Sequence, residues 1–121
     1  MEPARRFQDL VMWQKSHALT LRTYRLTTTY PKHEIYGLSA QMRRAAVSVS
    51  ANIAEGFSKR GRADKARYLN TAQGSLEELR YYFLLSRDLE YLKADASWED
   101  VHEVSRILGG YVRTLRDPDP N

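Results

Sequence analysis

The chain of 121 residues contains no cysteine. Disulfides, thiolate metal sites and cysteine nucleophiles are therefore excluded. The sequence also lacks any apolar run near the roughly 20 residues that span a bilayer, and its first ten residues, MEPARRFQDL, have no apolar segment like that of a signal peptide. We therefore expect a cytoplasmic protein that has no membrane partner.

The sequence motifs of common enzyme classes are missing as well. There is no HExxH, GxxxxGK or GxSxG motif. The histidines, His17, His33 and His102, fall on different predicted elements, and none has a His or carboxylate at metal-ligand spacing except His102, with Asp100 and Glu103. Helical bundles that bind metals use a pair of inward Glu-x-x-His motifs, and the sequence does not supply such a pair. We expect no catalytic residues, no metal site and no cofactor, and predict that the protein is not an enzyme.

Apolar residues recur every three or four positions in four segments, which is the spacing of one helix face, and almost no stretch alternates as a strand would. The predicted helices cover residues 10–29, 34–57, 64–89 and 97–115. Short connections imply antiparallel neighbours. With no repeat and no linker, residues 1–121 should form a single all-α domain, an antiparallel up-down-up-down four-helix bundle.

Local signals set the ends of these helices. Tyr30 precedes a proline, which disfavours the α conformation, and the charge of Glu34 suits a helix N-terminus. Gly56 ends the second helix, and Ser97 with Asp100 resembles a capping box before the fourth. In the first helix Leu10, Gln14, Ala18, Leu21 and Arg25 lie on one side, with Val11, Leu19 and Leu26 close by. The apolar stripe of the second helix is Leu38, Met42, Ala45, Val49 and Ile53.

A polar row follows the edge of the second helix's apolar stripe, at Arg44, Ser48, Asn52 and Glu55. Unpaired polar groups at such a boundary cost roughly 1 to 3 kcal/mol each, so they should hydrogen-bond to one another or to a facing helix. Glu55 should have a partner, because a carboxylate near a helix C-terminus is unfavourable: Lys59, a base from another helix or a tyrosine hydroxyl. A structural network that fixes helix or subunit register is the favoured interpretation, and ligand binding is the alternative.

The positive charge is concentrated in the first half of the chain. Residues 1–67 have thirteen Lys and Arg against five Asp and Glu, whereas residues 68–121 have six against ten. Within nine residues the loop SKRGRADKAR places five cations, Lys59, Arg60, Arg62, Lys65 and Arg67. Such a cluster can bind phosphates, can be a solvated loop, or can serve attraction between the two halves or between subunits. No DNA-reading or RNA-stacking motif is present, so any nucleic-acid binding should be backbone-directed.

Eight tyrosines and two tryptophans exceed what a thin bundle can enclose. Because these aromatics are spread over several predicted helices, a subunit interface is favoured over base stacking.

Three stretches carry a family resemblance: FQDLVMWQKSHAL, YPKHEIYGLSAQMRRAAVSVSANIAEG and AQGSLEEL. They resemble the bacterial four-helix bundle proteins that include the rRNA intervening-sequence proteins and the accessory variability determinant of diversity-generating retroelements. The resemblance implies a homopentameric ring with a basic surface, and, in the retroelement branch, partners that are nucleic acid and a reverse transcriptase. The positions that match the family signature are Arg43, Arg44, Asn52, Glu55 and Gly56.

These features together predict a non-enzymatic, oligomeric helical bundle that binds RNA or DNA without sequence preference. The residues expected to contact nucleic acid are the five loop cations and Arg43. The alternative is a protein-interaction scaffold whose charges serve subunit or partner docking.

Overall fold

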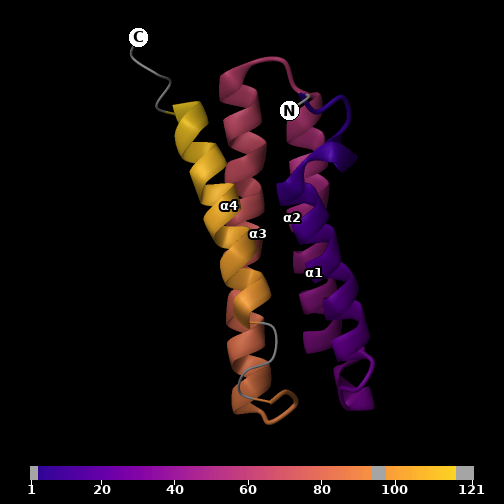
Figure 1. Cartoon of the computed structure of the whole chain (residues 1–121). Helices are drawn as coiled ribbons and strands as arrows, with labels where there is room; N and C mark the ends of the chain where they lie inside the picture. Colours follow the sequence, from indigo (N-terminus) through magenta and orange to yellow (C-terminus); the bar gives the residue numbers. More distant parts are fainter. Residues whose placement is uncertain (1–2, 94–97, 117–121) are drawn as a thin grey trace.

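The computed structural model describes residues 3–93 and 98–116, which form four α-helices and no strand. Successive helices run in opposite directions (Figure 1). The all-α prediction is therefore confirmed. Ser97, the predicted capping residue of the last helix, lies outside the described residues. The helices are α1 (Val11–Thr27), α2 (Leu38–Ser58), α3 (Arg62–Asp88) and α4 (Trp98–Arg116), with 3-10 turns at Phe7–Asp9 and Lys32–Glu34.

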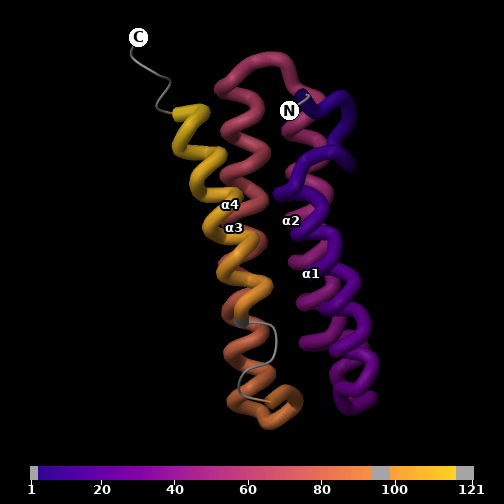
Figure 2. Tube along the Cα trace, in the orientation of Figure 1, coloured from indigo at the N-terminus to yellow at the C-terminus, as the bar shows by residue number. Residues whose placement is uncertain are grey.

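Each helix packs against two others. α2 contacts α1 and α3, α3 also contacts α4, and α4 contacts α1. The connection between α2 and α3 lies at the same end of the molecule as the N-terminus, whereas the turn between α1 and α2 lies at the opposite end (Figure 2). The basic loop and the α1–α2 turn are thus at opposite ends of the bundle.

The core lies along the facing stripes of α2, α3 and α4. All five residues of the apolar stripe predicted on the second helix are buried, as are Leu69, Leu79 and Phe83 of α3. α4 contributes Val101, Val104, Leu108 and Val112. Burying a side chain of this size stabilises the fold by roughly 1.5 to 3 kcal/mol, so this one core accounts for the arrangement of the helices.

α1 buries a face rich in hydroxyl groups rather than the row from Leu10 to Arg25. Ser16, Thr23 and Thr27 are buried, and each donates a hydrogen bond to the carbonyl four residues earlier, at 2.7 to 2.8 Å. Of the row from Leu10 to Arg25, only Leu10 is not exposed. A hydroxyl that is hydrogen-bonded within its own helix can enter the core without losing a partner. The hydroxyl face of α1 can therefore be buried while the row from Leu10 to Arg25 faces outward.

α2 begins at Leu38, four residues after the predicted start at Glu34. The Glu34 carboxylate lies in the preceding turn, and its Oε1 accepts the Leu38 N–H at 3.2 Å. A Cβ at Gly37 would lie 2.8 Å from that oxygen, so glycine leaves room for the contact. Glu34 therefore caps α2 from outside the helix, where its charge favours the positive end of the dipole.

Candidate nucleic-acid interface

The loop after α2 presents its cations in three different circumstances. Arg60 and Arg62 are exposed and make no ion pair within residues 3–93 and 98–116. Lys59 lies over the Tyr68 ring, with Nζ 5.0 Å from its centroid. Arg67 approaches the same ring at 5.8 Å and forms an ion pair of 3.1 Å with Asp64. Two cations thus lie against the Tyr68 ring at the end of the bundle, and two more are exposed in the same stretch of sequence.

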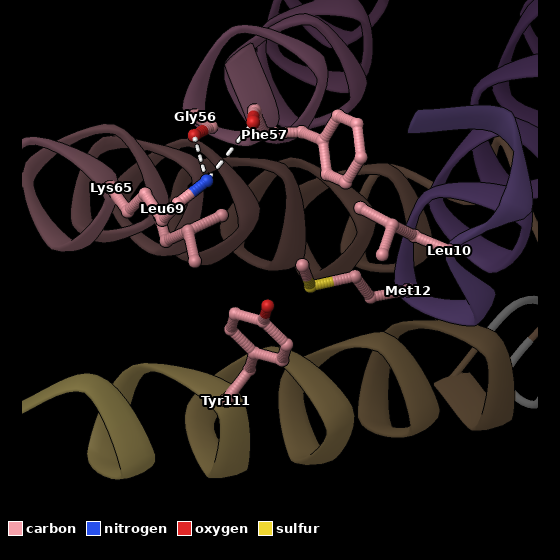
Figure 3. Close-up of a pocket in the computed structure, with 7 residues that line it drawn as sticks. All are labelled: Leu10, Met12, Gly56, Phe57, Lys65, Leu69 and Tyr111. Atoms are coloured by element: carbon pink, nitrogen blue, oxygen red, sulfur yellow. Dashed lines mark hydrogen bonds between the residues drawn. The ribbon is translucent and has the colours of Figure 1, made fainter. Parts of the chain in front are cut away.

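The Lys65 side chain, from α3, caps the C-terminal end of α2. Its Nζ donates to the carbonyl oxygens of Phe57, at 3.0 Å, and Gly56, at 3.4 Å (Figure 3). Lysine in this position satisfies carbonyls that the last helical turn leaves unpaired. The cavity beside it, bordered by Leu69 and Tyr111, has a volume of about 10 Å³, which is room for about one water molecule. This cavity is too small to be a ligand site.

Arg43 belongs to the other end of the molecule. Sixteen positions separate it from Lys59, about 24 Å along a helix. Its Nε–H donates to Thr27 Oγ1 at 2.8 Å, one Nη2–H donates to the Tyr24 carbonyl at 3.3 Å, and the guanidinium lies 4.7 Å from the centre of the Tyr24 ring. The structure therefore does not bring Arg43 together with the loop cations.

Part of the polar row forms a bridge between α2 and α3. Ser48 and Ser75 share a hydrogen bond of 2.7 Å, and Asn52 Nδ2 donates to the Ser48 carbonyl at 2.8 Å and to its hydroxyl at 3.1 Å. Arg44 is not joined to this group and contacts Gln41 at 3.4 Å.

The partner expected for Glu55 is not found. Its carboxylate makes no hydrogen bond or ion pair within the described part of the chain, and the side chain is exposed. Water can solvate an exposed carboxylate, which removes the physical need for a partner.

Two ion pairs connect the basic first half of the chain with the acidic second half. Lys15 pairs with Glu103 at 3.1 Å and Arg22 with Asp100 at 3.2 Å, joining α1 to α4. All four side chains are 40 to 47% exposed, so each pair contributes at most about 1 kcal/mol. Some of the charge asymmetry therefore serves contacts within the chain.

The start of α2 holds a partly buried polar cluster that the sequence pattern did not reveal. Tyr91, which follows α3, donates to Glu34 Oε2 at 2.9 Å. The Leu38 N–H, followed by this hydroxyl, lowers the pKa of the Glu34 carboxyl, and the same contact raises the pKa of Tyr91. Burial raises the pKa of Tyr30, whose ring lies 5.1 Å from that of Tyr91.

The Tyr30 hydroxyl is buried and has no hydrogen-bond partner within residues 3–93 and 98–116. Ser86 is close enough to moderate the rise in the pKa of Tyr30, but it donates its proton to the Tyr82 carbonyl at 2.7 Å, and no hydrogen bond joins the two hydroxyls. Contacts between residues more than fifty positions apart leave no periodic signal, so sequence patterns could not find this cluster.

An open apolar groove of about 320 Å³ runs between α1 and α2. Trp13 stacks on His17 with ring centroids 4.7 Å apart, and Phe7 meets Trp13 edge-on at 5.0 Å. The wall on α2 is formed by Val47, Ser50, Ala51 and Ala54. Apolar surface of this kind is typical of contact sites between proteins.

In residues 3–93 and 98–116, no helix combines the length and the apolar character that crossing a membrane requires. Across the same ranges, no three His, Asp or Glu side chains gather closely enough to hold a metal ion.

Comparison with known proteins places this geometry in a family. Residues 8–110 match the family described as 23S rRNA-intervening sequence protein. The chain belongs to that family. A crystal structure of a protein of unknown function from the S23 ribosomal protein family of Bacteroides thetaiotaomicron is similar, with a TM-score of 0.79 and 25% sequence identity over 86% of this chain and 96% of that one. No curated protein matches the sequence. The resemblance seen in the sequence is thus confirmed for the family.

Proposed function

We propose that this member of the family is a non-enzymatic bundle that binds nucleic acid through the basic loop, without sequence preference. The supporting observation is the group of loop cations at one end of the bundle: Lys59 and Arg67 approach the Tyr68 ring, and Arg60 and Arg62 are exposed to solvent. Asp64 is the one carboxylate within the loop stretch. Exposed cations can contact successive phosphates, and a flanking aromatic ring can stack on a base of any sequence.

Two cations of the predicted set have a smaller part in this proposal. Lys65 contributes its positive charge, but its ammonium group is engaged with two α2 carbonyls. Arg43 lies at the far end of the bundle and would contact a strand only if that strand extended along the whole of α2.

Binding of labelled single-stranded RNA, single-stranded DNA and duplex DNA at 50 mM salt tests the proposal. The loop variant changes Lys59, Arg60, Arg62 and Arg67 to Gln. Its affinity should fall by roughly 30- to 100-fold, because four phosphate contacts are lost. The matched control variant changes four exposed cations elsewhere, Arg25, Lys93, Arg106 and Arg113, to Gln, and should stay within about twofold of the unchanged protein. Equal losses in both variants, or no binding by the unchanged protein, would rule the proposal out.

Self-association is the second part of the proposal. The apolar groove between α1 and α2 supports it, and the family resemblance suggests a homopentameric ring. Light-scattering mass with and without nucleic acid tests the assembly. Ala51→Glu places a charge in the groove and should reduce the mass to that of one chain, whereas Ala63→Glu, on the exposed start of α3, should not. A single-chain mass for the unchanged protein would contradict the ring.

A protein-interaction scaffold is the second candidate function. The ion pairs between α1 and α4 favour it, because they show charges used for docking between elements of this chain. Tyr36, which is 95% exposed, adds an aromatic contact point. A reverse transcriptase is the partner expected if the chain follows the retroelement branch. Recovery of a protein partner that survives nuclease treatment would favour this function over nucleic-acid binding.

A further inference from the structure

A second cavity lies at the turn between α1 and α2, away from the basic loop. It has a volume of about 400 Å³, within the range of about 300 to 1,000 Å³ of small-ligand sites. Its walls come from the end of α1, the connecting turn and the first two turns of α2. Two cations and several hydroxyl groups line it, and no carboxylate does: Thr27, Thr28, Tyr30, Lys32, Ile35, Ser39 and Arg43.

Arg43 is fixed in place by neutral groups. Thr27 and the Tyr24 carbonyl each accept one of its N–H groups, which leaves three of its five donors uncommitted. No carboxylate forms an ion pair with Arg43 within residues 3–93 and 98–116. Its charge is therefore preorganised and uncompensated, and these are the properties with which arginine recognises phosphate.

The hydroxyls of Thr28 and Ser39 offer a ligand an acceptor and a donor, respectively. Thr27 donates its proton to the Thr23 carbonyl at 2.8 Å and accepts the Arg43 Nε–H at 2.8 Å. Thr28 donates to the Arg25 carbonyl at 2.6 Å, which leaves the lone pairs of its oxygen able to accept from a ligand. Ser39 is 94% buried, lines the cavity, and forms no hydrogen bond in the described part of the chain. The Ser39 oxygen itself is still accessible, so its hydroxyl can donate a hydrogen bond to a polar ligand in the cavity.

Among carboxylates, that of Glu34 is closest in sequence to the residues that line the cavity, but its oxygens are hydrogen-bonded to groups outside the lining. One oxygen accepts the Leu38 N–H and the other the Tyr91 hydroxyl, and His33 lies 3.9 Å away. Lys32 has no ion pair within the described ranges and is exposed, so its ammonium group can turn toward an anion at the cavity. The field inside the cavity is thus set by Lys32 and Arg43.

We infer that this cavity binds a phosphate monoester of a small hydroxylated molecule. Arg43, Lys32 and the Ser39 hydroxyl would donate to the phosphate oxygens, and the lone pair of Thr28 would accept from a hydroxyl of the ligand. Ile35 supplies an apolar wall for the rest of the molecule. The ligand could be a free nucleotide or the 5′-phosphate at the end of a nucleic-acid strand, since both present the same group.

Calorimetric titration of the full chain with adenosine 5′-monophosphate, ribose 5-phosphate and adenosine tests the inference. The two phosphate monoesters should bind at one site per chain, and adenosine should not bind. Lys32→Gln should weaken binding by about tenfold and Ser39→Ala by about fivefold, as expected for the loss of one charged and one neutral hydrogen bond. Arg44→Gln is the matched control, because Arg44 neighbours Arg43 but lies outside the cavity and contacts Gln41.

The source of the phosphate is decided by comparing oligonucleotides that carry a 5′-phosphate or a 5′-hydroxyl. A preference for the phosphorylated strand that disappears in Lys32→Gln, yet persists in the loop variant, identifies strand ends; no preference, with the monoesters still bound, identifies free small molecules. The inference is overturned if neither monoester binds at 10 mM. It is equally overturned if Lys32→Gln and Ser39→Ala bind them as the Arg44→Gln control does.

Discussion

At the start of α2 the guanidinium of Arg43 is held by Thr27 and Tyr24, whereas past its end Arg60 and Arg62 extend into solvent. A long charged side chain loses up to about 2 kcal/mol of conformational entropy when a ligand fixes it. Arg43 has met most of that cost on folding, so it suits a ligand of fixed shape. The loop arginines remain adaptable and suit a polymer whose phosphates have no fixed arrangement. Arginines that look alike in the sequence can therefore suit two kinds of ligand, one of fixed shape and one that is flexible.

The largest expected difference between the two ends of α2 is in stability. Arg43→Ala should lower the free energy of unfolding by about 2 kcal/mol, since it removes the donor to Thr27 Oγ1, one of the two side-chain donors to the Tyr24 carbonyl, and the contact with the Tyr24 ring. Arg60→Ala should change it by less than about 0.5 kcal/mol. Urea denaturation monitored by circular dichroism measures both. Similar values for the two variants would mean that Arg43 is no more fixed than the loop.

The next contrast is between two glycines, Gly56 near the end of α2, which packs closely against α3, and Gly74 within α3, which has open space beside it. A Cβ at Gly56 would lie 3.1 Å from Tyr68 Cβ, whereas a Cβ at Gly74, within α3, would meet nothing within 4 Å. Gly56→Ala should destabilise the bundle by about 1 to 2 kcal/mol. Gly74→Ala should stabilise it by about 0.5 to 1 kcal/mol, because alanine is the better helix former. Thermal unfolding should move in opposite directions, and a shared direction would contradict the close approach of α2 and α3.

The smallest effect concerns pH at the start of α2. The folded-state pKa of Glu34 is lowered from 4.5, chiefly by the Leu38 N–H. Its stabilising contribution is therefore complete above the unfolded value and is lost as the pH falls through the lower folded value. Glu34→Gln should reduce stability by about 1 kcal/mol at pH 7, as for the loss of a helix cap, and much less at pH 2. Denaturation at both values checks this, and an equal difference at both would show that the charge is irrelevant.

The three-to-four spacing of apolar residues predicted the buried face of a helix correctly where the buried residues are apolar. On α2 the stripe from Leu38 to Ile53 is buried throughout. On α1 the pattern was only partly right. Leu19 is buried, but Leu21 is exposed, and Ser16, Thr23 and Thr27 enter the core because their hydroxyls hydrogen-bond within the helix. Apolar periodicity carries no information about hydroxyls that return their hydrogen bond to the backbone.

The candidate sites were predictable to different degrees. The loop cations are adjacent in sequence, so their clustering is visible before folding. The cavity at the start of α2 joins Thr27, Lys32, Ser39 and Arg43 only through the α1–α2 turn, and the contact between Glu34 and Tyr91 depends on the return of α3. These sites arise from tertiary packing, which spacing along a single helix does not report.

The salt dependence of nucleic-acid binding tests the central claim most directly. For single-stranded RNA the logarithm of the association constant should fall with the logarithm of the salt concentration with a slope of roughly −3, as expected for four loop cations at about 0.7 each. In the variant with Lys59, Arg60, Arg62 and Arg67 changed to Gln, the slope should approach zero. A slope that the loop substitutions leave unchanged would contradict the claim that this loop holds the nucleic acid.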